Sequence, residues 1–204
     1  RVALSGDFKK PDGTQAFPMF DLSKLDKEPD LEWEYVDPIE GRMEASSLVG
    51  FDALILLAAS FDKNSLPNDN RLRLIARFGV GYDTVDIEAC SSSGIGVVIT
   101  PDGVRRPVAA SILGFILALS GKMFIKDKLV RGGPAMFNER GSYMGVGLVG
   151  KTLGSVGIGN IGSEMFKLCR PLDMTFIAHD PYADPRIAEE LNVKLVNLQT
   201  VFET

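Results

Sequence analysis

The feature that most constrains this chain is a glycine turn at residues 157–162, which read GIGNIG. A strand-like apolar segment precedes the turn, a helix-like segment follows it, and Asp180 lies 18 residues after Gly162 at the end of the next strand-like segment. This order of strand, turn, helix, strand and carboxylate is the pattern with which parallel α/β domains bind a dinucleotide. The glycine spacing alone is weak evidence in a chain with 21 glycines among 204 residues, and the acid at the expected distance makes it specific.

Each glycine of the turn has its own physical reason. Gly157 allows the sharp turn out of the strand, Gly159 has no side chain to hold a pyrophosphate away from the backbone, and Gly162 lets the helix pack closely on the sheet. The phosphates would then face the positive end of a helix dipole.

Composition favours a globular protein that acts on small molecules. The chain is 45% hydrophobic with a formal charge of −5, so no electrostatic attraction to nucleic acid or to an anionic membrane is expected. Cys90 and Cys169 lie far apart without a C-x-x-C motif, which predicts no disulfide framework and no metal site.

The most apolar run, residues 108–119, is short for a bilayer span and predicts a buried helix. No signal peptide pattern opens the chain, so we expect a cytoplasmic protein, with further residues preceding Arg1 because no initiator Met is present.

Alternating apolar and polar segments predict an α/β fold with two Rossmann-like or flavodoxin-like parallel-sheet domains, residues 1–100 and 101–204. The strands of the first domain are expected at residues 2–5, 33–36, 53–57, 74–78 and 97–99, with Asp86 as the N-cap of its last helix. The composition of residues 100–107 predicts an interdomain loop, followed by a helix over residues 108–130 and a surface loop over 131–150.

The second domain is expected to begin with a strand at residues 152–156. Its helix after Gly162 is predicted to end at Pro171, and strands are expected at 174–178 and 193–196, with helices at 185–191 and from 198. This is about the first half of a doubly wound dinucleotide domain, so the second domain is expected to be incomplete in this chain.

Four collinear motifs resemble the D-isomer-specific 2-hydroxyacid dehydrogenases, the family that includes D-3-phosphoglycerate dehydrogenase and glyoxylate/hydroxypyruvate reductase. The motifs are residues 77–86 (RFGVGYDTVD), 94–101 (GIGVVITP), 108–110 (VAA), and 148–162 with 180–182 (DPY). Residues 1–60 add only a compatible α/β pattern. The resemblance implies a substrate-binding catalytic domain at 1–100, an NAD-binding domain at 101–204, and NAD-dependent oxidation of a small 2-hydroxy acid or reduction of a 2-oxo acid.

The resemblance also implies residue roles. Backbone N–H groups of Val80 and Gly81 would bind the substrate carboxylate, although a plain strand-ending turn explains the same residues. Residues expected to contact the cofactor are Val108 near the nicotinamide, Gly157, Gly159, Asn160, Ile161 and Gly162 at the pyrophosphate, Asp180 at the ribose hydroxyls, and Pro181 and Tyr182 at the adenine. A carboxylate at Asp180 favours NAD over NADP, while nearby Arg186 leaves NADP open.

Three positions depart from the family pattern. Phe166 stands where a small residue is usual, so its ring must turn aside or the helix must lift. Ala110 replaces a usual Glu, and Asp173 replaces a common glycine before the second strand.

By motif order, the Arg, Glu or Asp, and His of the family's catalysis would lie after Thr204. No catalytic residue is therefore assigned here, and residues 1–204 alone are expected to be inactive. The single histidine, His179, is interpreted as a packed strand residue. Arg105 and Arg106 would either bind an anion or form a solvated pair in the interdomain loop.

Two further functions remain open from the sequence. One is an NAD(H)-sensing protein similar to the corepressors built on the same scaffold, and the other is a different Rossmann enzyme such as an adenosylhomocysteine hydrolase or a methyltransferase. Rapid NADH oxidation would reject the first, and the motifs at 79–81 and 100–101 argue against the second. A homodimer formed through the helix from Val108 is also expected.

Overall fold

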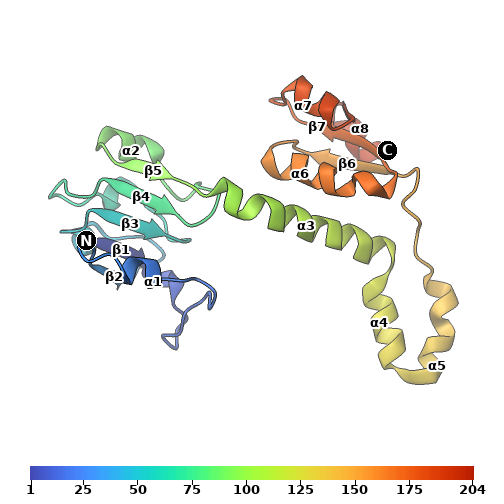
Figure 1. The fold of residues 1–204 in the computed structure, drawn as a ribbon, viewed down its shortest axis with the longest axis horizontal. Helices are drawn as coiled ribbons and strands as arrows, with labels where there is room; N and C mark the ends of the chain where they lie inside the picture. The colour runs from blue at the N-terminus through green and yellow to red at the C-terminus, as the bar shows by residue number, and fades with distance from the viewer. The chain divides into compact units, whose positions relative to one another are not determined.

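The computed structural model describes all residues 1–204 and divides into two compact units, Arg1–Pro101 and Asp102–Thr204 (Figure 1). Each unit contains a parallel sheet, which confirms the predicted fold class.

The first unit is built on a five-stranded parallel sheet in the order β2-β1-β3-β4-β5. Its strands are β1 (Val2–Ser5), β2 (Trp33–Val36), β3 (Ala53–Leu56), β4 (Leu74–Arg77) and β5 (Gly96–Val98). The helical segments between them are η1 (Gly6–Phe8), α1 (Ser23–Asp26), η2 (Ala45–Leu48), η3 (Lys63–Ser65) and α2 (Ile87–Ser92). All five strands therefore end at the same edge of the sheet, and the loops after them share that edge.

Alternating burial explains why these segments form strands. Leu54 and Leu56 of β3 are fully buried, as is Ile75 of the neighbouring β4, and all three belong to one apolar core with Phe61 and Cys90. The predicted N-cap of α2 is confirmed, because the Asp86 carboxylate accepts a hydrogen bond from the Ala89 N–H at 2.9 Å.

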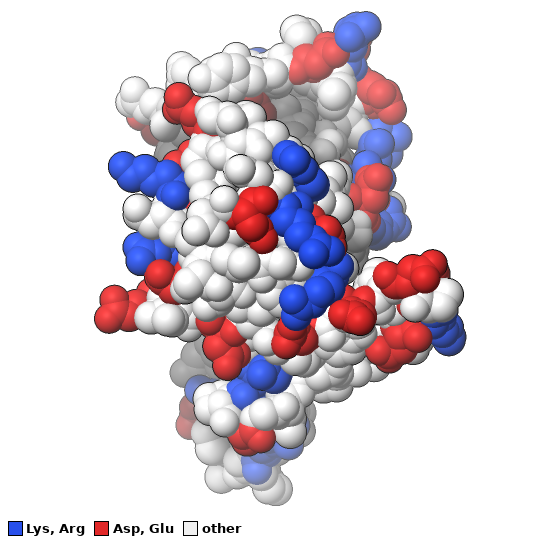
Figure 2. Space-filling view, turned by 90° about the vertical axis from the view of Figure 1, so that its left-hand side faces the viewer, with Lys and Arg blue, Asp and Glu red and all other residues white.

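Ion pairs connect the amino ends of these strands. The Arg71 guanidinium donates to Asp52 at 2.8 Å, and the terminal ammonium of Arg1 pairs with the same carboxylate. Arg71, and then the ammonium, hold the pKa of the Asp52 carboxyl well below its usual range. On the face shown in Figure 2, Lys and Arg residues lie beside Asp and Glu residues, so opposite charges are interspersed there.

The second unit is built on a three-stranded parallel sheet in the order β6-β7-β8. Its strands are β6 (Thr152–Val156), β7 (Thr175–His179) and β8 (Val193–Leu195), and its later helices are α6 (Asn160–Cys169), η5 (Arg170–Leu172), α7 (Pro185–Glu190) and α8 (Leu198–Glu203). Phe166 of α6 is buried with its ring centroid 5.1 Å from that of Phe176 in β7, so the bulky ring turns into the core. Cys169 is buried in the same cluster.

The predicted loop at 100–107 and the predicted helix at 108–130 are both wrong in their bounds. The structure has one helix, α3 (Pro101–Ser120), then a break, and then α4 (Met123–Arg131). Pro101 fits the first helical turn, where no N–H is needed, and the helix continues past Pro107. It stops where Gly121 precedes Lys122, which adopts a left-handed conformation with φ of +52°.

The expectation that α3 is buried is also wrong for this chain. Ala109 is fully buried, and Ile112, Leu113 and Ile116 pack against the same cluster as α6, but the opposite face is exposed. By length and composition alone, α3 is long and apolar enough to cross a membrane, although one such helix is weak evidence. The predicted surface loop at 131–150 contains α5 (Gly133–Phe137) and η4 (Asn138–Tyr143).

Asp173 shows why glycine is common at its position. It follows η5 in a left-handed conformation with φ of +52°, and no hydrogen bond of its side chain compensates for this strain. We therefore expect Asp173→Gly to raise the free energy of unfolding by about 0.5–1 kcal/mol, measured by urea denaturation. Asp173→Ala, which removes the carboxylate but keeps a Cβ, should bring no such gain. Equal effects of both variants would show that charge rather than backbone strain matters.

Candidate functional site

Two neighbouring strands of the second sheet bring the glycine turn and Asp180 together. The turn follows β6 and Asp180 follows β7, and these strands pair in parallel with Val156 opposite His179 (Figure 1). Both segments consequently lie at the carboxyl edge of the sheet, where open α/β sheets bind ligands.

The fold itself requires two of the three glycines. Gly157 has φ of +96°, which favours glycine, and its N–H donates to the His179 carbonyl at 2.8 Å. A Cβ on Gly162 would lie 2.7 Å from the Gly157 carbonyl oxygen, so any side chain there would push the helix away from the strand.

Gly159 has no comparable structural reason to be a glycine. Its φ is −66°, and a Cβ built on it would meet no atom within 4 Å. The space over this residue is therefore open, as close approach of a ligand to the backbone requires.

Two serine hydroxyls fix the inward-facing carbonyls of the turn. Ser155 donates to the Gly157 carbonyl at 2.7 Å, and Ser163 donates to the Ile158 carbonyl at 2.6 Å. The Ile158 side chain is buried and anchors the turn in the core. Sequence reasoning missed these three residues, because only their position beside the glycines pointed to them.

The N–H groups of the turn remain available. Those of Gly159, Asn160, Ile161 and Gly162 have no acceptor within the protein, since they begin the ten-residue helix α6. Successive free N–H groups at the positive end of a helix dipole form a binding site for phosphate.

The Asp180 carboxylate lies directly against this turn. Its Oδ2 accepts from the Ile158 N–H and its Oδ1 from the Tyr182 N–H, each at 2.9 Å. These two hydrogen bonds lower the pKa of the Asp180 carboxyl, so the group is ionised at neutral pH. Each oxygen can still accept a further hydrogen bond, which suits a pair of vicinal hydroxyls.

The other predicted cofactor residues are exposed. Pro181 and Tyr182 directly follow Asp180 and are exposed. Val108 is exposed on α3, one residue before Ala109, which packs in the same cluster as Ile158. Arg186, which left NADP open, pairs with Asp184 at 2.7 Å.

Val80 and Gly81 lie in the first unit, at the carboxyl edge of its sheet after β4. Their N–H groups also have no acceptor within the protein. Gly79 precedes them with φ of +139°, and its N–H donates to Thr100 Oγ1 at 3.1 Å while its carbonyl accepts from the Thr100 N–H at 2.8 Å. We call residues 79–81 the carboxylate loop, because two free N–H groups on a fixed turn suit a carboxylate.

Arg77 supports this loop and was also missed by sequence reasoning. Its guanidinium donates to the Phe78 carbonyl, and a Cβ on Gly79 would overlap it. The Arg77 Nε is buried without a partner. The Arg77 guanidinium therefore lies against Phe78 and Gly79, directly before the two free N–H groups in the chain.

The remaining candidate side chains, those of Arg105, Arg106 and His179, interact with neighbouring groups of the protein. Arg105 and Arg106 lie on helix α3 rather than in a loop, and they pair with Asp102 and Glu164, respectively. His179 Nδ1 lies 3.0 Å from the Val196 carbonyl oxygen, as a packed strand residue would.

Comparison with known proteins identifies what this arrangement is similar to. The family model of the D-isomer specific 2-hydroxyacid dehydrogenase catalytic domain matches residues 21–161. D-3-phosphoglycerate dehydrogenase of Archaeoglobus fulgidus is 34% identical over 152 residues, covering 74% of this chain and 28% of that protein. Glyoxylate reductase of Thermococcus litoralis is 34% identical over 157 residues, covering 74% of this chain and 47% of that protein. The chain thus spans about a quarter to a half of the length of these relatives.

The fold is shared with solved structures. The crystal structure of D-lactate dehydrogenase from Aquifex aeolicus, complexed with NAD and lactic acid, matches with a TM-score of 0.77 at 20% identity. The match covers 98% of this chain and 57% of that one. At this identity the likeness concerns the fold.

The open space at Gly159 gives a direct test of the glycine turn. In the full-length protein, Gly159→Val should fold normally but bind NADH at least about tenfold more weakly, because the added side chain would occupy the open space through which a phosphate group could approach the backbone. NADH fluorescence titration and thermal unfolding measure the two properties. Gly147→Val is the matched control, since a Cβ there also meets nothing within 4 Å. Unchanged NADH affinity in the Gly159 variant would remove the turn from the site.

Proposed function

Because the chain belongs to the D-isomer specific 2-hydroxyacid dehydrogenase family, we propose that its protein is an NAD-dependent oxidoreductase acting on the CH–OH group of a small 2-hydroxy acid. The observation that carries this proposal is the row of free N–H groups at residues 159–162 beside the ionised Asp180. When bound, the nicotinamide accepts the hydride from C2 of the hydroxy acid or donates it to C2 of the oxo acid.

The second unit would hold the cofactor through three kinds of contact. The N–H groups from Gly159 to Gly162 would bind the pyrophosphate. They have no acceptor within the protein, and the space over Gly159 is open. Asp180 would accept from the ribose hydroxyls while its hydrogen bond to Ile158 keeps it in place. Pro181 and Tyr182 would flank the adenine.

The same contacts favour NAD over NADP. A ribose 2′-phosphate would face the ionised Asp180 carboxylate. Arg186 would not offset this charge readily, because its guanidinium already forms a two-pronged ion pair with Asp184.

The first unit would bind the substrate carboxylate. The N–H groups of Val80 and Gly81 would donate to it, and the Arg77 charge beside the loop would favour an anion. Reduction then adds the hydride to C2 and a proton to the carbonyl oxygen. We assign no proton donor within residues 1–204, since their single histidine is held in β7.

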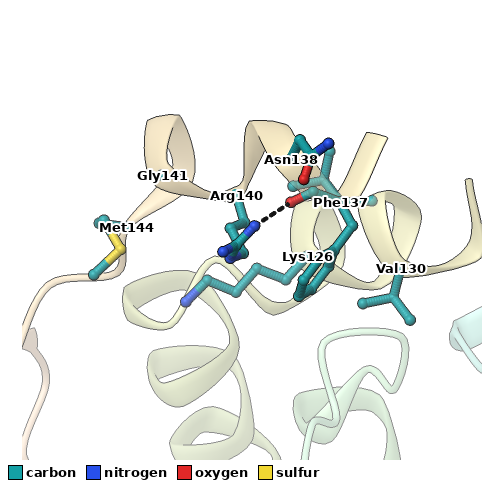
Figure 3. A pocket seen from close by; sticks show the side chains of 8 residues that line it. Lys126, Val130, Phe137, Asn138, Arg140, Gly141 and Met144 are labelled. Carbon is teal, nitrogen blue, oxygen red and sulfur yellow. Dashed lines mark hydrogen bonds between the residues drawn. The ribbon is translucent and has the colours of Figure 1, made fainter. Parts of the chain in front are cut away.

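We further propose a homodimer formed through the region from α3 to η4. On the outer face of α3, Leu119 is 70% exposed, and Phe115 is also exposed. A cavity of about 530 Å³ between α4 and η4 has an apolar wall that includes Val130, Phe137 and Met144 (Figure 3). An exposed apolar surface of this kind is typical of an interface between subunits.

Turnover tests the proposed activity. The full-length protein should oxidise NADH in the presence of glyoxylate, followed at 340 nm, which would reject a purely NADH-sensing role. Asp180→Ala should raise the KM for NADH about tenfold or more and reduce the preference for NADH over NADPH, because the acceptor of the ribose hydroxyls and the repulsion are both lost. If the ratio of kcat/KM for NADH to kcat/KM for NADPH is the same in Asp180→Ala as in the wild type, the role of Asp180 is contradicted.

Sedimentation tests the dimer. The wild-type protein should be dimeric at micromolar concentration, and Leu119→Glu should make it monomeric by placing a charge in the apolar interface. Phe202→Glu is the matched control, because Phe202 is 75% exposed on α8, outside the proposed interface. A wild-type monomer would overturn the proposal.

A further inference from the structure

Four phenylalanines gather at the carboxyl edge of the first sheet. Phe8 follows β1 and Phe78 follows β4, and their ring centroids are 5.3 Å apart. Phe17 and Phe20 come from the loop between η1 and α1, and their centroids lie 5.8 and 5.0 Å from that of Phe78. The rings thus reach from the end of β1 to the end of β4. We call this group the aromatic cluster.

Part of the cluster is not covered. Phe8 is buried and packs against the other three rings, whereas Phe17 and Phe78 are 42% and 37% exposed. The strand between β1 and β4 is β3, and the small residues Ala58 and Ala59 follow it. The edge therefore presents partly exposed aromatic rings, as apolar ligand sites do.

The aromatic cluster is continuous with the carboxylate loop. Phe78 is bonded directly to Gly79, and the free N–H groups of Val80 and Gly81 follow. In a 2-oxo acid the reacting C2 is bonded to the carboxylate carbon, and the side chain begins at the next carbon. A substrate whose carboxylate is held by the loop consequently starts its side chain close to Phe78.

A carboxylate at this edge disfavours an anionic side chain. The Asp7 carboxylate, beside Phe8 in the chain, accepts from the Ala58 and Ala59 N–H groups at 2.9 Å each. The charge of this carboxylate at the same sheet edge would repel a second anionic group on the substrate, and the Arg77 guanidinium lies at the Phe78 carbonyl, on the loop that would hold the first carboxylate.

We propose that the exposed faces of Phe17 and Phe78 bind the substrate side chain and that the substrate is a 2-oxo acid with an apolar side chain, aromatic or branched aliphatic. The inference rests on the proposed function and names the substrate class of the same site. The reaction is 2-oxo acid + NADH + H⁺ → 2-hydroxy acid + NAD⁺, with the hydride added to C2 and the proton to its oxygen.

Competing substrates test the proposal in the full-length protein. We expect kcat/KM for phenylpyruvate and 4-methyl-2-oxopentanoate to exceed that for glyoxylate at least about tenfold, and Phe17→Ala to lower the first two values about tenfold. Glyoxylate has no side chain, so its value should change less than about twofold. Phe17→Leu, which keeps an apolar residue for folding, should lower the value for phenylpyruvate in the same direction.

The controls separate specificity from folding. Met19 lies in the same loop and is 94% exposed. Met19→Ala should therefore leave kcat/KM unchanged for all three substrates. If Phe17→Ala lowers kcat/KM equally for all three substrates, the ring has only a structural role and the inference is overturned. Preference for glyoxylate or phosphohydroxypyruvate over the apolar acids also overturns it and leaves the proposed function standing. Bound NADH without turnover of any 2-oxo acid would overturn the proposed function itself.

Discussion

The hydrogen bond from the Ile158 N–H to the Asp180 carboxylate is the interaction on which the second unit's candidate site depends. It ties the turn after β6 to the end of β7, and both bonded groups lie at the same sheet edge. Ser155 and Ser163 hold the turn's carbonyls on the inner side. The free N–H groups of the turn are fixed on the side that also carries the charge of Asp180, so the site is preorganised by the fold before any ligand arrives.

The first unit uses a related device at its own carboxyl edge. In the order β2-β1-β3-β4-β5, β2 is added on one side of β1 and β3 to β5 are added on the other. The strand order therefore reverses between β1 and β3, which is where ligands bind in such sheets. Asp7 follows β1 and receives two N–H groups from the loop after β3. An aspartate therefore connects neighbouring strand ends in both units. The two differ in their second oxygen, because Asp7 Oδ1 is buried without a partner while Asp180 Oδ1 accepts from Tyr182.

The sheets and the glycine turn could be predicted because their signals are local. Short runs of Val and Ile gave each strand to within one or two residues, and the glycine spacing with Asp180 located the turn. The first turns of the helix at 101–120 were missed because Pro101 and Pro107 usually punctuate loops, yet one occupies the first turn and the other is accommodated by the helix. The supports at Ser155, Ser163 and Arg77 could not be predicted, since each binds a backbone carbonyl only one to five residues away and the sequence pattern does not show which way these side chains turn.

The proposed preference for NAD rests on how the charges at this site are already paired. Both Asp180 oxygens accept backbone hydrogen bonds, which keeps the carboxylate ionised and in position while leaving lone pairs for hydroxyls. The nearest candidate to neutralise a 2′-phosphate in sequence, Arg186, is held by the carboxylate that caps its own helix, Asp184. To recruit Arg186, a phosphate would have to replace that two-pronged ion pair and also approach Asp180. Two separate electrostatic terms thus support the proposed preference for NAD over NADP.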